Sequence, residues 1–142
     1  MKELIERWNP DIGLARCTIK YTTKAGTQLV GIGIASCHPE DAPYMSKLTG
    51  GMIANYRAEI DLIKQINNYE IKPEIAALKH VLCTMRHSKK YNPDSYEATR
   101  LKKELAHRMD EYDENKAAIK DLYTLLNNYI KQKDEIHKKG QN

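Results

Sequence analysis

The stretch Gln28-Leu29-Val30-Gly31-Ile32-Gly33-Ile34-Ala35 predicts a β-strand with two unlike faces. Successive side chains of a strand point to opposite sides, so β-branched residues at every second position from Val30 share one face. The alternate positions are Gly31, Gly33 and Ala35, whose small side chains leave the other face nearly bare. A bare face lets another backbone, a helix or a ligand approach closely. We therefore expect this strand to lie against a close neighbour.

A second alternating segment comes just before this strand. Between residues 16 and 23, Cys17, Ile19 and Tyr21 fall on one side, and residues 24–27 form a turn signal. Two alternating runs joined by a glycine-containing turn predict a β-hairpin. In residues 2–8 the apolar positions Leu4, Ile5 and Trp8 predict one or two short amphipathic helical turns.

The remainder of the chain has helical spacing. One helix follows Gly50-Gly51, with apolar residues three and four positions apart, and is punctuated at Asn67-Asn68 and Pro73. The next helix ends near residue 86. These elements predict an α+β fold with a small N-terminal antiparallel sheet. They also predict a single domain over residues 1–142, β-rich at 15–45 and helical at 46–142.

The last helix is expected over residues 95–137, on the order of 60 Å long. Its apolar seam follows an alternating three-four repeat typical of coiled coils. The seam residues are Ala98, Leu101, Leu105, Arg108, Tyr112, Asn115, Ile119, Leu122, Leu126, Tyr129, Lys133 and Ile136. We expect that a monomer of 142 residues leaves such a helix uncovered. Either it bends back near residues 111–115, as a helical hairpin, or it pairs with another chain, and we favour a homodimer or larger homo-oligomer.

Two polar residues, Arg108 and Asn115, interrupt this seam. Polar residues at such positions commonly fix the register of a helix pair, which is one interpretation. The other is a ligand pocket built into the helix interface, with Arg100 and Arg108 facing phosphate. Glu104 lies four residues before Arg108 and is expected to pair with it.

Residues 86–95 form a basic joint before the last helix. Asn92 suits the N-cap and Pro93 the first helical position, so the free amides after Asn92 predict an anion site at the helix N-terminus. His87 lies in the joint, and Tyr91 and Tyr96 are placed to stack on a base. A solvated basic turn is the alternative.

Composition limits the classes of function. The net charge is +4 with 30% charged residues, which gives a mild preference for anions and little similarity to a DNA-coating protein. Nine tyrosines suit recognition surfaces. The longest apolar run, residues 29–35, is too short to span a bilayer, and Glu3 and Glu6 differ from a signal peptide. We therefore expect a cytoplasmic protein that contacts no membrane.

The cysteines and histidines favour structural roles over metal binding or catalysis. The three cysteines Cys17, Cys37 and Cys83 are widely spaced, as for reduced thiols. A zinc site on the helical face of His80, Cys83 and His87 needs a fourth ligand, for which Cys37-His38 is the candidate, so we expect no metal. No phosphate-cradling loop or nucleophile–base pair is present, and we expect neither catalysis nor a cofactor.

Two motifs carry a resemblance to a known family. Residues 33–41, Gly33-Ile34-Ala35-Ser36-Cys37-His38-Pro39-Glu40-Asp41, and residues 53–58, Ile53-Ala54-Asn55-Tyr56-Arg57-Ala58, resemble the first family of Thoeris anti-defence proteins. The resemblance implies a phage "sponge" that sequesters a cyclic ADP-ribose isomer, the signal of bacterial TIR-domain defence proteins. It further implies an N-terminal sheet, long C-terminal helices, ligand pockets at a dimer interface, and hexamers that bind cyclic oligonucleotides at separate sites.

The resemblance also implies site residues. Arg57 and Asn92 match the family's arginine and asparagine, and Arg100 and Arg108 are candidates for two later arginines. Where the family has an aromatic residue, this chain has Leu82 or Met85. The expected ligand-binding residues are therefore Arg57, Met85, His87, Tyr91, Asn92, Tyr96, Arg100 and Arg108.

Two other functions stay open at this point. Lys89-Lys90 and the lysines of residues 131–139 are compatible with a small nucleic-acid-binding protein. The coiled-coil-like seam is compatible with an adaptor that blocks a bacterial protein directly. The sequence does not identify the ligand, the stoichiometry or a second ligand site.

Overall fold

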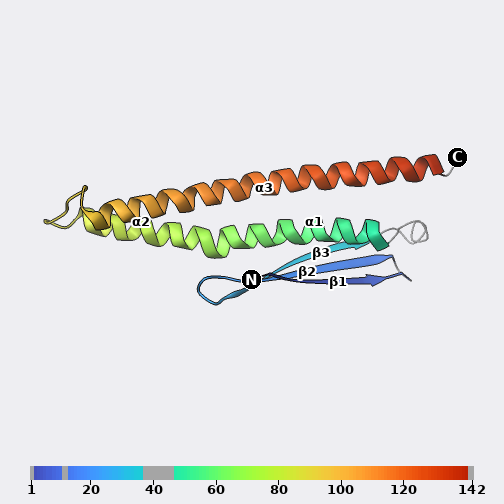
Figure 1. The fold of residues 1–142 in the computed structure, drawn as a ribbon, viewed down its shortest axis with the longest axis horizontal. Coiled ribbons are helices and arrows are strands. Elements are labelled where there is room, and N and C mark those ends of the chain that lie inside the picture. Colours follow the sequence, from blue (N-terminus) through green and yellow to red (C-terminus); the bar gives the residue numbers. More distant parts are fainter. Residues whose placement is uncertain (1, 11–12, 37–46, 141–142) are drawn as a thin grey trace.

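The computed structural model describes residues 2–10, 13–36 and 47–140. Three strands come first: β1 (Lys2–Asn9), β2 (Leu14–Thr22) and β3 (Gln28–Ser36). The helices follow: α1 (Lys47–Ile66), the π-helical turn η2 (Asn67–Ile71), α2 (Lys72–Arg86) and α3 (Tyr96–Gly140). Figure 1 shows the sheet under one half of a long rod made by the helices. The fold is α+β, as predicted.

The strands form an antiparallel sheet in the order β1-β2-β3. The predicted hairpin is confirmed, and its turn is closed by the Thr23 amide on the Thr27 carbonyl at 2.8 Å, with Gly26 at φ +86°. The prediction of helical turns over residues 2–8 is wrong, because this segment pairs with β2 from Lys2 to Asn9. A neighbouring strand supplies hydrogen-bond partners that a short isolated helix lacks.

Helix α1 covers the bare face of β3. Gly31 and Gly33 are buried against Ala54, Ala58 and Leu62, and a Cβ built on Gly31 would lie 2.5 Å from the Ala58 carbonyl oxygen. The predicted close neighbour is therefore a helix backbone. The core between sheet and helix consists of Ala15, Cys17, Ile19, Leu29, Ala35, Ala54, Ala58 and Leu62.

The expected break after α1 is a widened helical turn instead. The Lys72 amide donates to the Asn67 carbonyl, five residues back, and Pro73 occupies the first turn of α2. Proline has no N–H and its ring clashes with the carbonyl four residues before it, so the wider π-turn accommodates Pro73 without ending the helix. Residues 47–86 thus form one long helical segment.

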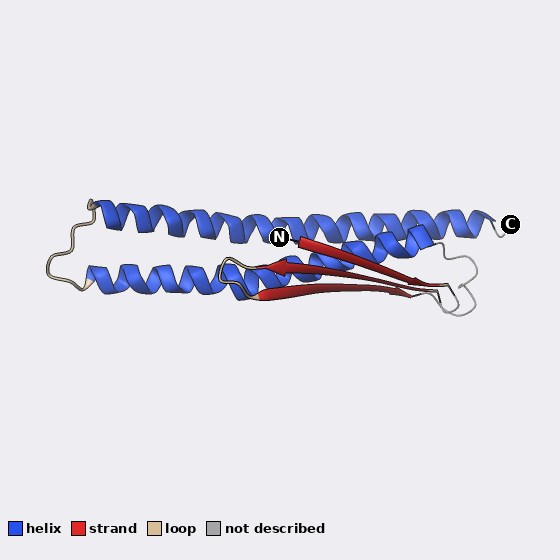
Figure 2. Ribbon diagram, turned by 60° about the horizontal axis from the view of Figure 1, so that its bottom comes forward, coloured by secondary structure: helices blue, strands red, loops and turns tan. Residues whose placement is uncertain are grey.

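Helix α3 is continuous for 45 residues, so the predicted alternative of a helical hairpin is wrong. The expectation that one chain leaves it uncovered is also wrong, because residues 47–86 run antiparallel along it (Figures 1 and 2). The predicted seam from Ala98 to Lys133 is buried or half-buried at every position, while the side chain of Ile136 lies outside the described part. None of the described helices is long and apolar enough to cross a membrane.

Candidate ligand-binding groove

The basic joint forms the exposed tip of the rod between α2 and α3. The N-cap of helix α3 lies three residues later than predicted, because the Ser95 hydroxyl, and not the Asn92 side chain, accepts the hydrogen bond from the Ala98 amide at 3.2 Å. Asn92 instead closes the preceding turn, in which its Oδ1 accepts from the Asp94 amide at 2.9 Å and its carbonyl accepts from the Ser95 amide at 3.1 Å. The Asp94 and Ser95 amides therefore already donate within the turn, and Pro93 has no N–H. These amides are not free to bind the predicted anion.

The predicted site residues do not meet in one chain. His87, Asn92, Tyr96 and Arg100 are exposed at the tip, where Met85 and Tyr91 are half-buried. Arg57 lies on α1 beside the sheet, separated from Arg86 by a helical length of roughly 40 Å. The prediction that Arg57 and the tip residues of the same chain form one pocket is therefore wrong. Helical periodicity predicted the elements but not how far apart they lie.

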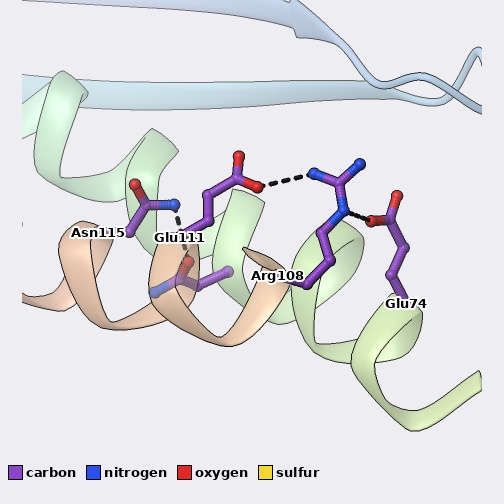
Figure 3. Close-up of polar contacts among 5 residues, drawn as sticks. Glu74, Arg108, Glu111 and Asn115 are labelled. Atoms are coloured by element: carbon purple, nitrogen blue, oxygen red, sulfur yellow. Dashed lines mark hydrogen bonds and ion pairs between the residues drawn. The ribbon is translucent and has the colours of Figure 1, made fainter. Parts of the chain in front are cut away.

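Arg108 is held by carboxylates. Its Nε lies 2.8 Å from Glu74 Oε2, and its Nη1 donates to Glu111 Oε2 at 2.7 Å (Figure 3). Burial by itself lowers the Arg108 pKa, but the Glu111 hydrogen bond and the charges of Glu74, Glu111 and Glu104 raise it overall. Glu104, the predicted partner, thus contributes its charge, and Glu74 and Glu111 make the contacts. These contacts favour a structural role for Arg108.

Asn115 also acts within the helix interface. Its Nδ2 donates to the Asn67 Oδ1 at 2.9 Å, and the Asn67 Nδ2 donates to the Tyr112 carbonyl at 3.2 Å. Asn67 is only 4% exposed and lies in the π-turn. A buried amide pair has its hydrogen bonds satisfied in one alignment of the helices only. The interruption of the seam therefore supports the register interpretation.

Arg57 belongs to a row of α1 side chains along the outer edge of β3. Its Nη1 donates to the Ile34 carbonyl at 2.7 Å. Asp61 Oδ2 accepts from the Ile32 amide at 2.9 Å, and Gln65 Nε2 donates to the Val30 carbonyl at 2.7 Å. The three side chains are spaced four residues apart, so they follow one helix face. They satisfy backbone groups that an edge strand otherwise leaves open.

The same face of α1 forms one wall of a groove of about 500 Å³. Its lining comes from β3, α1 and α3: Ile32, Arg57, Ile60, Asp61, Lys64, Tyr123, Leu126, Asn127 and Ile130. Lys64 Nζ donates to the Tyr123 hydroxyl at 2.7 Å and lies 5.0 Å from the ring centroid. The groove thus combines two cations, one carboxylate, an aromatic ring, an amide and four aliphatic side chains.

The chemistry of the groove suits an organic anion with a flat ring. Arg57 gives one N–H to Ile34, and a guanidinium with five donors keeps others for a phosphate. Tyr123 is 41% exposed, which leaves ring surface for stacking. Sequence reasoning missed Lys64, Tyr123 and Asn127, because the partner helix that brings them together is about 60 residues away.

A second cavity, of about 600 Å³, lies at the start of α1 against β1 and β2. It is lined by Glu6, Arg7, Trp8, Ala15, Arg16, Cys17, Lys47, Leu48, Gly51, Met52 and Asn55, none of which was predicted as a ligand residue. Burial, with the charges of Glu6 and Glu59, raises the pKa of the Cys17 thiol from 9.0 to about 11. Cys17 is therefore a protonated core residue near neutral pH.

Comparisons with protein-family models, curated proteins and solved structures find no match. The resemblance to Thoeris anti-defence proteins therefore stays a prediction. Within residues 2–10, 13–36 and 47–140, no group of three His, Cys, Asp or Glu side chains is placed to hold a metal ion. Cys37 and His38, the suggested fourth-ligand pair, lie outside these residues.

Proposed function

We propose that the protein binds and sequesters a small cyclic nucleotide in the groove between β3, α1 and α3. The ligand class follows the resemblance, which implies a cyclic ADP-ribose isomer made by a bacterial anti-phage defence. The observation that carries the proposal is Arg57, the family-matching arginine, which lines this groove. It shares the groove with the cation Lys64 and the stacking surface of Tyr123.

In this proposal Arg57 and Lys64 bind the diphosphate, Tyr123 stacks on the base and Asn127 hydrogen-bonds a polar edge of the ligand. Such charge-assisted contacts are about twice as strong as neutral ones. Asp61 is the carboxylate of the groove, and it already accepts from Ile32 and from Gln65 at 3.1 Å. Because these two hydrogen bonds fix the orientation of the carboxylate, we propose binding without chemical turnover.

The proposal includes a homodimer, because the tip residues reach the groove only from a second chain. The Glu74–Arg108 and Asn67–Asn115 contacts define how residues 47–86 are aligned along α3, that is, which residues of the two helical segments lie side by side. The groove lies level with residues 123–130 of α3, and the tip precedes residue 96. An antiparallel pair of rods related by an axis near Glu111 lays one tip over the other groove. Asn92, Tyr91 and Arg100 of a second copy then close the site.

The exposed side chains near this level support such a pair. Tyr69 is 68% exposed and Met109 is 43% exposed, and each lies within about a turn of the proposed axis. Large apolar side chains near the middle of a rod are suited to burial against a second rod.

Calorimetry with purified cyclic ADP-ribose isomers tests the proposal. We expect Arg57→Gln and Lys64→Met each to weaken binding about tenfold, which is about 1.4 kcal/mol. The matched control is Lys103→Met, an exposed lysine of α3 outside the groove. Heat should release the ligand unchanged. Equal affinities for all three variants would place the ligand elsewhere, and recovery of a cleaved product would establish an enzyme.

The exposed basic tip carries a second candidate function, nucleic-acid binding. Arg86, Lys89 and Lys90 are all exposed there. Phosphate contacts give an affinity that falls steeply with added salt. A gel shift at low salt that Lys89→Met with Lys90→Met abolishes would favour this function over nucleotide sequestration.

A further inference from the structure

The two outer edges of the sheet differ. The edge of β3 is closed by Arg57, Asp61 and Gln65 of α1, as described above. β1 forms the opposite edge, on the side of the sheet away from α3 (Figure 1). Leu4 of β1 is 53% exposed although its strand partner Ile19 is buried. An unprotected edge strand with an exposed apolar residue is a template for another strand.

The register shows which backbone groups of β1 face outward. In antiparallel strands, a residue directs both its N–H and its C=O either toward the neighbouring strand or away from it, alternately. Val30, Ile32 and Ile34 face away from β2, since α1 binds their backbone groups. The odd-numbered residues of β3 therefore bond β2, and they pair there with odd-numbered residues, so the even-numbered residues of β2 bond β1. Because these even-numbered residues pair with odd-numbered residues of β1, the even-numbered residues of β1 direct their N–H and C=O groups outward. Within the described part, no hydrogen bond reaches the outward groups of Leu4 and Glu6.

We propose that β1 pairs antiparallel with β1 of a second copy of this chain, with Ile5 on the two-fold axis. This register joins the outward groups of Leu4 to those of Glu6, and it places Glu3 of each copy opposite Arg7 of the other. The two sheets then form one sheet of six strands. The interface is separate from the groove and does not depend on the proposed ligand.

Charge favours this register. Within one chain Arg7 lies opposite Arg16, a like-charged cross-strand pair. Glu3 of a second copy would place a carboxylate on the other side of Arg7, twice per dimer. A shift of the pairing by two residues in one direction puts Glu6 on the two-fold axis, opposite Glu6 of the other copy. A shift by two residues in the other direction puts Leu4 on the axis and shortens the ladder to residues 2–6. A shift by one residue opposes outward groups to inward ones, which breaks the ladder.

A disulfide between single cysteines tests the register directly. In a background with Cys37→Ser and Cys83→Ser, we expect Ile5→Cys to give a covalent dimer on mild oxidation, since residues on the axis are close enough for a disulfide. The matched control is Thr18→Cys, directly opposite Ile5 on β2. In the proposed dimer the two Thr18 positions lie three strand spacings apart, whereas the two Ile5 positions lie one spacing apart. Equal cross-linking of both variants, or none of Ile5→Cys, would overturn the proposal.

A proline pair tests the edge without any cysteine. Glu6→Pro removes an outward N–H, so the chain should stay folded by circular dichroism and lose the β1 contact, with a smaller assembly mass by sedimentation. Ile5→Pro removes an N–H that bonds β2 and should unfold the sheet. A folded Glu6→Pro variant with the assembly mass of the unaltered protein would contradict the proposed pairing.

Discussion

Replacing Gly33 by alanine tests the close packing between β3 and α1. A Cβ on Gly33 would overlap the Ala54 carbonyl oxygen and the Ala58 amide nitrogen, both backbone atoms of α1. Added atoms in a packed core cost about 1–3 kcal/mol, and rigid backbone neighbours place Gly33→Ala at about 3 kcal/mol. For a chain of this size that is a fall in Tm of about 10 °C.

Gly51→Ala is the matched control. Gly51 also lies within α1, but a Cβ there meets nothing within 4 Å. Alanine in a helix is more stable than glycine by about 0.5–1 kcal/mol, so this variant should be stabilised. Urea unfolding followed by circular dichroism measures both effects, provided that the m-value stays constant. If Gly33→Ala unfolds at the same urea concentration as the unaltered protein, α1 does not contact β3 through its backbone.

Three further predictions concern a helix cap, a buried amide pair and pH. Ser95→Ala should cost about 1 kcal/mol of stability and Asn92→Ala less, because Ser95 caps α3. A larger loss for Asn92→Ala would instead indicate Asn92 as the N-cap, as predicted from the sequence. Asn115→Leu should cost about 1–3 kcal/mol because buried Asn67 loses a partner, and a double-mutant cycle with Asn67→Leu should show a smaller loss than the sum. Because the pKa of Cys17 rises from 9.0 to about 11 on folding, its contribution to the free energy of unfolding should be complete below pH 9 and fall progressively as pH rises toward 11. Urea unfolding of Cys17→Ala should not show this pH dependence.

Much of the fold could be predicted from local periodicity. The alternation in residues 16–35 predicted β2, β3 and the bare face, and the three-four repeat predicted the buried seam of α3. The strand β1 could not be predicted in this way, because eight residues with a weak pattern become a strand only when β2 lies beside them. Pro73 likewise looked like a helix end, and only the structure shows that a π-turn accommodates it.

The candidate site could be predicted only in part. Arg57 lines the groove, but its neighbours Lys64 and Tyr123 come from helices that meet by packing. Asn92 looked like an N-cap because residue type favours it there, yet Ser95 caps the helix and Asn92 closes the turn before it. Several residue types can cap a helix, so the choice among adjacent candidates depends on the path of the backbone.

The sequence by itself determined which segments are strands and helices wherever hydrophobic spacing was regular, since that spacing depends only on near neighbours in the chain. It also determined that one face of β3 is bare, because glycine carries no side chain in any fold. Only the tertiary structure decided which partners these segments meet. Arg108 is paired with Glu74 and Tyr123 lies beside Lys64 because an antiparallel alignment brings distant residues level, and no local pattern specifies that alignment.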